Sequence, residues 1–158
     1  MRGSEEWARY LFLQIIAGLK KIHDKNIAHL DINIGNVLVD IDANWLPRIK
    51  IAGFELSQDN HHEVRTPYGR SNRAPELEGD DYYPYDGEKA DVYASAFILL
   101  AIYAYDGFKT RGNCDERYNP YQYFVENGNL SRYWDDLGLS PTYDLQNMLY
   151  GMLQQDPD

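Results

Sequence analysis

Cysteine, basic side chains and long apolar runs are scarce in this 158-residue sequence, and each scarcity excludes a class of protein. The single cysteine, Cys114, cannot form an internal disulfide, which is typical of a reducing compartment. Fifteen basic residues against 25 acidic ones give a formal net charge of −10, which repels nucleic acid and anionic lipid. The longest apolar run, residues 94–104, is far shorter than the roughly 20 residues that span a bilayer. We therefore expect a cytoplasmic protein without nucleic-acid or membrane partners.

The apolar residues that are present predict one mainly helical domain with a small β-hairpin. Hydrophobic residues make up 44% of the chain, enough for a core. A first helix is expected at 4–23, with Ser4 as its N-cap and an apolar stripe at Trp7, Leu11, Ile15, Leu19 and Ile22.

Further along the chain, the pattern predicts a hairpin and then several helices. A short buried strand at 37–39 is expected to pair with a strand at 45–51. Residues 89–105 are apolar on nearly all sides, which predicts a buried helix. Late helices are expected within 120–154, the last of them with Ser140 as N-cap and Pro141 at its first position.

The loop at 29–36, with the sequence HLDINIGN, carries the residues most suggestive of chemistry. Phosphoryl transfer needs a group that accepts a hydroxyl proton and a cation that neutralises the developing charge. Asp31 could be the proton acceptor, and Asn36 could hold a metal through its amide oxygen. A purely structural Asp and Asn in a turn would have the same pattern.

Five motifs follow one another in order: HLDINIGNVLVD, IKIAGFELS, Ala74-Pro75-Glu76, EKADVYASAFILL and YWDDLGLSPTYDLQNMLYGMLQQDPD. They make the chain resemble the eukaryotic protein kinases of the serine/threonine type, with late helices similar to those of protist members. The resemblance covers only the large helical lobe, as a partial kinase domain over 1–158 whose small N-terminal lobe is absent. It assigns the catalytic loop to 29–36, the metal-binding segment to 53–55, and the activation segment to residues up to 76. The last two motifs are the buried helix at 89–105 and the late helices at 120–154.

The resemblance also implies roles for individual positions. Asp31 matches the catalytic base and Asn36 a metal ligand, while Leu38 matches the residue beneath the adenine of ATP. Structural roles fall on His29 and Phe54 in a hydrophobic stack, on Asp91 as a buried acceptor for the catalytic-loop backbone, and on Glu76 at the end of the activation segment. His29 and Phe54 are expected in the core in any case.

Several positions depart from the pattern of the family. Gly53 stands where the principal magnesium-binding aspartate is expected, and Asn33 stands in place of the lysine that contacts the transferred phosphate. Leu30 replaces the arginine that would read a phosphate on the activation segment, so phosphorylation at Thr66 or Tyr68 is not expected to act in the usual way. No glycine-rich nucleotide lid precedes the loop, and the chain stops before the arginine expected to pair with Glu76.

These departures predict a catalytically impaired kinase homologue, a pseudokinase that acts by binding proteins. ATP and Mg²⁺ are implied by the resemblance alone, and both Gly53 and the missing lobe argue against their binding. One alternative is an active serine/threonine kinase that uses Asp31 as base and Asn36 as metal ligand. Another is a small-molecule phosphotransferase of the aminoglycoside-kinase type, because GNVLVD followed by GFEL is similar to that family's loop.

Overall fold

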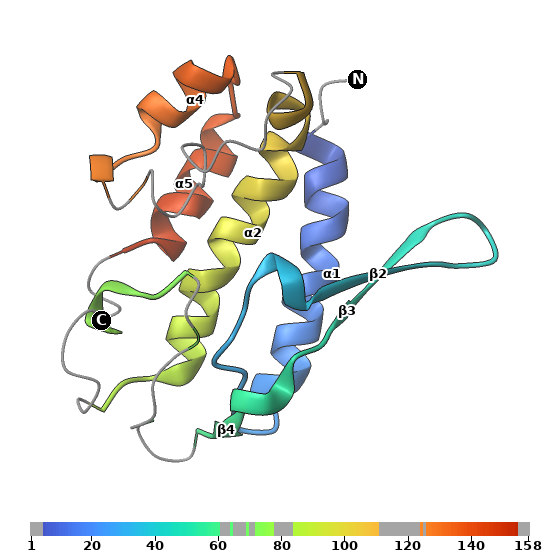
Figure 1. The fold of residues 1–158 in the computed structure, drawn as a ribbon, viewed down its shortest axis with the longest axis vertical. Helices are drawn as coiled ribbons and strands as arrows, with labels where there is room; N and C mark the ends of the chain where they lie inside the picture. Colours follow the sequence, from blue (N-terminus) through green and yellow to red (C-terminus); the bar gives the residue numbers. More distant parts are fainter. Residues whose placement is uncertain are drawn as a thin grey trace.

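The computed structural model describes residues 5–60, 64, 69, 72–77, 84–110, 124 and 126–154, the side chains of 76 and 105–110 excepted. These residues form a mainly helical body from which one β-hairpin projects (Figure 1). This arrangement confirms the predicted fold class.

Helix α1 (Glu5–His23) has a charge pattern that suits the helix dipole, with acidic residues in its first turn and basic residues in its last. Its buried face consists of Ala8, Phe12, Ile15 and Leu19. The predicted apolar stripe was therefore wrong at its start, because Trp7 is half-exposed. Adjacent helix positions lie about 100° apart, so burying Ala8 turns Trp7 away from the core.

Helix α2 (Gly87–Thr110) passes through the middle of the body, between α1 and α5 in Figure 1, and packs against α1, α4 and α5. Asp86 starts the helix, since its Oδ1 atom accepts hydrogen bonds from the amides of Glu88 and Lys89. Every residue from Tyr93 to Leu100 is buried. The middle of the helix is thus apolar all round because other elements cover it all round.

Two later helices, α4 (Ser131–Leu137) and α5 (Tyr143–Met152), complete the described body. The prediction that Ser140 caps the last helix was wrong, since Thr142 is the N-cap and its hydroxyl accepts a hydrogen bond from the Leu145 amide. Thr142 also donates to the Glu5 carboxylate, from its amide at 3.2 Å and from its hydroxyl, so this cap joins the starts of α5 and α1. Most of the helix predicted at 120–126 lies outside the described residues.

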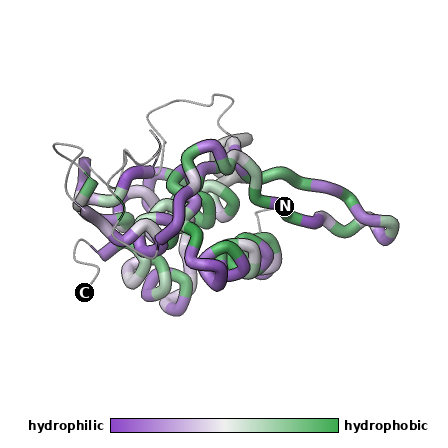
Figure 2. The backbone as a smooth tube through the Cα atoms, turned by 90° about the horizontal axis from the view of Figure 1, so that it is seen from below, coloured by the Kyte–Doolittle hydropathy of each residue, from purple (hydrophilic) through white to green (hydrophobic). Residues whose placement is uncertain are grey.

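The hairpin consists of β2 (Val37–Ile41) and β3 (Pro47–Ile51), antiparallel with Val37 opposite Ile51. Its second strand packs on α1, where the Gln14 amide donates to the Pro47 carbonyl and accepts from the Ile49 amide. The prediction of a buried strand at 37–39 was wrong, because Val39 is 61% exposed. The hairpin extends outward from the helical body, as Figure 2 shows, and it is β3 that packs against α1.

A second strand pair, which the sequence pattern did not predict, anchors the two ends of the site. Strand β1 (Ile27–Ala28) pairs antiparallel with β4 (Gln58–Asp59). The loop at 29–36 follows β1 directly, and residues 53–55 shortly precede β4. This pairing closes the chain between them into a loop. Among helices of the described residues, none combines the length and apolarity needed to cross a bilayer.

Candidate active site

The start of the loop at 29–36 is fixed by the buried carboxylate of Asp91, which extends from α2. Its Oδ2 atom accepts a hydrogen bond from the His29 amide at 2.7 Å, and its Oδ1 atom accepts one from the Leu30 amide at 2.9 Å. His23, at the end of α1, places its Nε2 atom 3.0 Å from Asp91 Oδ2. Asp91 is fully buried, so these bonds offset the cost of removing its carboxylate from water.

Leu30 has an unusual backbone conformation for a leucine. Its φ angle is 66°, in the left-handed region that side chains other than glycine rarely adopt. The surroundings hold it there, because its amide bonds Asp91 and its carbonyl accepts from the Gly69 amide at 2.7 Å. The Leu30 side chain is fully buried in the core. A buried aliphatic group therefore lies where the resemblance would place a phosphate-reading arginine.

The carboxylate of Asp31 is bound by two amide side chains from its own loop. Asn33 Nδ2 donates to Oδ1 at 3.0 Å, and Asn36 Nδ2 donates to Oδ2 at 2.8 Å. Asn36 Nδ2 also donates to the Asp31 backbone carbonyl at 2.8 Å. Only the NH₂ group of Asn36 can donate to two acceptors, which fixes the orientation of its amide. We call Asp31, Asn33 and Asn36 with these bonds the amide clamp.

Gly53 leaves room for the amide clamp. A Cβ atom on Gly53 would lie 2.4 Å from both Cγ and Oδ1 of Asn36, a distance that real Cβ atoms do not show. The φ angle of Gly53 is 81°, which also favours glycine over residues with a side chain. The Asn36 amide thus occupies the space that a side chain at position 53 would enter.

Gly69 closes on Asp31 from a segment remote in sequence. A Cβ atom there would lie 2.0 Å from Asp31 Oδ1, so the backbone at Gly69 can approach the carboxylate only because the side chain is absent. No sequence signal linked Gly69 to the loop, since 38 positions separate it from Asp31 and the intervening pattern is irregular. His23 was also missed, because a histidine at a helix end more often serves the helix dipole.

His29 holds the loop through both of its ring nitrogens and is completely buried, as predicted. Its Nε2 atom donates to the Ala52 carbonyl at 2.9 Å, and its Nδ1 atom accepts from the Asp31 amide at 3.3 Å. These two partners determine which ring nitrogen carries the hydrogen. The ring of Phe54 lies 4.8 Å from that of His29, measured between centroids. Phe54 is nevertheless 48% exposed, so the expectation that it is a core residue was wrong: its short 3₁₀ turn, Phe54–Leu56, lies at the surface.

The remaining predicted positions are more dispersed. Leu38 is half-exposed on β2, directly after the loop. Glu76 belongs to a 3₁₀ turn, Pro75–Leu77, and its side chain lies outside the described residues, as do Thr66 and Tyr68.

The donor set around Asp31 does not fit a magnesium ion. Mg²⁺ requires octahedral oxygen coordination and is usually held in proteins through carboxylates. Both Asp31 carboxylate oxygens accept amide hydrogen bonds, and position 53 supplies no carboxylate. Within the described part of the chain, no group of three or more histidine, cysteine or acidic side chains could hold a metal ion.

Comparisons with known proteins agree on one family. The profile of the protein kinase domain matches residues 1–158. The chain is 35% identical over 104 residues to the serine/threonine-protein kinase CHK1 of Mycosarcoma maydis, covering 62% of this chain and 15% of that protein. It is 35% identical over 104 residues to the serine/threonine-protein kinase SRK2C of Arabidopsis thaliana, covering 64% of this chain and 29% of that protein.

A third relative is the SNF1-related protein kinase catalytic subunit alpha KIN12 of Arabidopsis thaliana, 38% identical over 101 residues. The match covers 62% of this chain and 19% of that protein. The matched region is thus less than a third of each of these relatives. The geometry around Asp31 and Asp91, together with a profile match along its whole length, places the chain in the protein kinase domain family.

Proposed function

We propose that this chain is a cytoplasmic protein-kinase-like domain that does not transfer phosphate and acts through contacts with other proteins. The observation that carries the proposal is the amide clamp: Asn36 binds Asp31 and fills the space beside Gly53. The closure of Gly69 on the same carboxylate adds to it.

The chemical argument concerns both the base and the charge of the transition state. Both oxygens of the Asp31 carboxylate accept amide hydrogen bonds, so a substrate hydroxyl would have to compete with two donors already in place. Loss of one group that stabilises transition-state charge typically costs about 3–4 kcal/mol of barrier. Here the magnesium carboxylate and the phosphate lysine are both replaced, by Gly53 and Asn33.

A transfer assay tests the catalytic half of the proposal. The 158-residue chain is incubated with radiolabelled ATP, Mg²⁺ and a serine/threonine peptide library, beside the variants Asp31→Ala and Asn36→Ala. We expect all three proteins to incorporate equally little phosphate, at the level measured for Asp31→Ala. Incorporation that requires Mg²⁺ and is lost in Asp31→Ala would overturn the proposal.

The competing function is an active serine/threonine kinase, and one observation favours it. Asp31 and Asn36 lie on one loop, with Asn36 Nδ2 only 2.8 Å from Asp31 Oδ2, so the two side chains could serve one reaction centre. That function requires the Asn36 amide to leave Asp31 and turn its oxygen toward a metal. Titration of Mg²⁺–ATP followed by the side-chain amide signal of Asn36 tests this requirement, since an unmoved signal would exclude the active kinase.

The exposed part of the hairpin supports the protein-binding half. We define the hairpin surface as the large apolar residues of this region that are about half-exposed or more: Leu38, Val39, Ile41, Trp45 and Leu46. Trp45 is 86% exposed. Five large apolar side chains exposed on one hairpin are a candidate surface for contact with another protein. A surface-sensitive fluorescent dye should bind the isolated chain, and an absence of dye binding would count against this half.

A further inference from the structure

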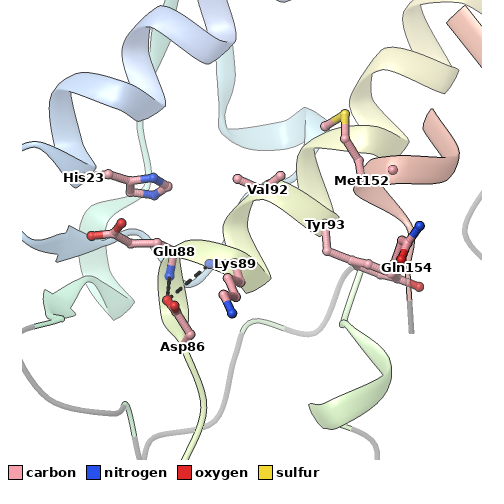
Figure 3. A pocket seen from close by; sticks show the side chains of 9 residues that line it. His23, Asp86, Glu88, Lys89, Val92, Tyr93, Met152 and Gln154 are labelled. Carbon is pink, nitrogen blue, oxygen red and sulfur yellow. Dashed lines mark hydrogen bonds between the residues drawn. The ribbon is translucent and has the colours of Figure 1, made fainter. Parts of the chain in front are cut away.

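A pocket opens where the end of α1, the start of α2 and the end of α5 meet. Its volume is about 410 Å³, within the usual size range of ligand sites, and it is partly open to solvent. Figure 3 shows its walls, which come from the end of α1, the start of α2 and the end of α5: His23, Asp86, Glu88, Lys89, Val92, Tyr93, Met152 and Gln154. We call this the α1–α2–α5 pocket.

The absence of a side chain at Gly151 leaves the wall of the pocket open. It lies in the last turn of α5, where a glycine costs about 1 kcal/mol of helix stability relative to alanine. Packing does not require it, since no described atom lies within 4 Å of the position that a Cβ would take. Its φ angle is not among the positive values of the chain, so the backbone does not require it either. What the missing side chain provides is space in the wall of the pocket.

The charges of the pocket favour a cation over an anion. The first amides of α2 are already used, by Asp86 for Glu88 and Lys89 and by the Asn60 side chain for Gly87. They are therefore not available to bind an anionic group. Lys89, the cation on the rim, already has a partner in the fold.

Glu88 supplies the negative charge for such a cation. Its side chain is half-buried in the pocket wall, and within the described residues its carboxylate makes no ion pair. The whole chain carries a formal charge of −10, which adds to the attraction for a basic partner.

The apolar part of the lining fits an aliphatic group beside that cation. Val92 is exposed on α2, Met152 is partly buried on α5, and Tyr93 is buried between them and the core. Methionine adapts its shape to different partners because its side chain is unbranched and flexible. We propose that the α1–α2–α5 pocket binds a peptide segment of a partner protein, with an aliphatic side chain on Val92 and Met152 and an adjacent arginine or lysine at Glu88.

Substitutions at Gly151 give a sharp test because the position is open. Gly151→Leu should fill the pocket without a clash, and Gly151→Ala is the matched control that leaves most of the space. Both should raise the melting temperature or leave it unchanged, because each improves helix propensity. The probe is the peptide acetyl-Leu-Arg-Leu-amide, titrated into the ¹⁵N-labelled 158-residue chain and followed by amide chemical shifts.

We expect saturable shifts around Val92 and Gly151, with Gly151→Leu weakening binding at least 10-fold and Gly151→Ala changing it less than 3-fold. Glu88→Gln should weaken binding of this peptide but not of acetyl-Leu-Gln-Leu-amide, which lacks the cation. The proposal is overturned if no saturation is reached, if Gly151→Leu binds as tightly as the parent, or if acetyl-Leu-Glu-Leu-amide binds equally well. None of these readouts depends on phosphate transfer or on the hairpin surface.

Discussion

The loop at 29–36 and the hairpin that follows it are adjacent in sequence but differ in how their side chains are satisfied. In the loop, two backbone amides donate to Asp91 of α2, and the Asp31 carboxylate accepts from two side-chain amides. In the hairpin, large apolar groups such as Val39 and Trp45 extend into solvent. The polar groups named in the loop thus have hydrogen-bond partners within the fold, whereas the described residues leave the side chains of the hairpin surface about half-exposed or more.

This difference indicates which region determines stability and which offers a surface. Removing one partner from a buried hydrogen-bonded network leaves the others unpaired, which is costly. Exposed apolar groups contribute little to folding, because they stay in water in both states. Substitutions in the loop should therefore lower stability, and substitutions in the hairpin surface should change only what the surface binds.

The largest effect is expected for Asp91→Ala. It leaves the buried amides of His29 and Leu30 without their acceptor, and releases the left-handed backbone of Leu30. We expect a loss of about 3 kcal/mol or more in the free energy of unfolding, measured by urea denaturation. Asp24→Ala is the matched control, since Asp24 pairs with Lys20 on the surface and should change stability by about 0.5 kcal/mol or less. Equal effects of the two variants would contradict the role given to Asp91.

The next largest effect separates crowding at Gly53 from backbone conformation. Gly53→Ala places a Cβ against Asn36 at a positive φ angle, whereas Gly138→Ala meets a similar φ angle with no atom within 4 Å. Gly138→Ala should cost about 1 kcal/mol, and Gly53→Ala about 1–3 kcal/mol more because Asn36 must move. The measurement is again urea denaturation, with the Asn36 side-chain amide signal as a second readout. Similar costs at both glycines would show that the amide clamp does not fill this space.

A smaller effect on stability, with a clear effect on binding, is expected at the hairpin surface. The double variant Val39→Lys and Ile41→Lys places charges on exposed positions, so the free energy of unfolding should change by about 0.5 kcal/mol or less per site. Dye fluorescence should fall by half or more, because apolar surface is lost. Ile15→Ala in the core is the contrast, with an expected loss of about 2–5 kcal/mol. Unchanged dye fluorescence would place the dye site elsewhere.

The smallest effect concerns acid and the hairpin turn. Backbone amides of Leu46 and Asn44 hold the pKa of the partly buried Asp42 carboxylate below its ordinary value. A lowered folded-state pKa stabilises the turn above the unfolded-state pKa, and this contribution is lost as pH falls through the folded-state value. In Asp42→Asn, local melting of the hairpin below pH 4 should lose part of its pH dependence, as followed by the amide shift of Asn44. The same pH profile in both proteins would contradict this role.

Local sequence was sufficient for the main helices, the hairpin and the loop that carries the site, but not for the β1–β4 pair. The apolar spacing located a helix that the structure places at Glu5–His23, and the unbroken apolar run of α2 indicated a buried position. These features follow from periodicity, which depends on neighbours along the chain. The errors arose where a second element decides burial: Trp7, Phe54 and Val39 are all apolar residues that nothing described covers fully.

What the sequence by itself determined is the family, the helical class and the positions that depart from an active kinase, because each is carried by residue type and order. Only the tertiary structure decided what those departures do. Gly53 by itself is a missing carboxylate, but in the fold it is also the space that the Asn36 amide fills. Gly69 and His23 joined the site through contacts across 38 and 68 positions, to Asp31 and Asp91. Such contacts depend on chain folding rather than on local pattern, so no spacing in the sequence could indicate them.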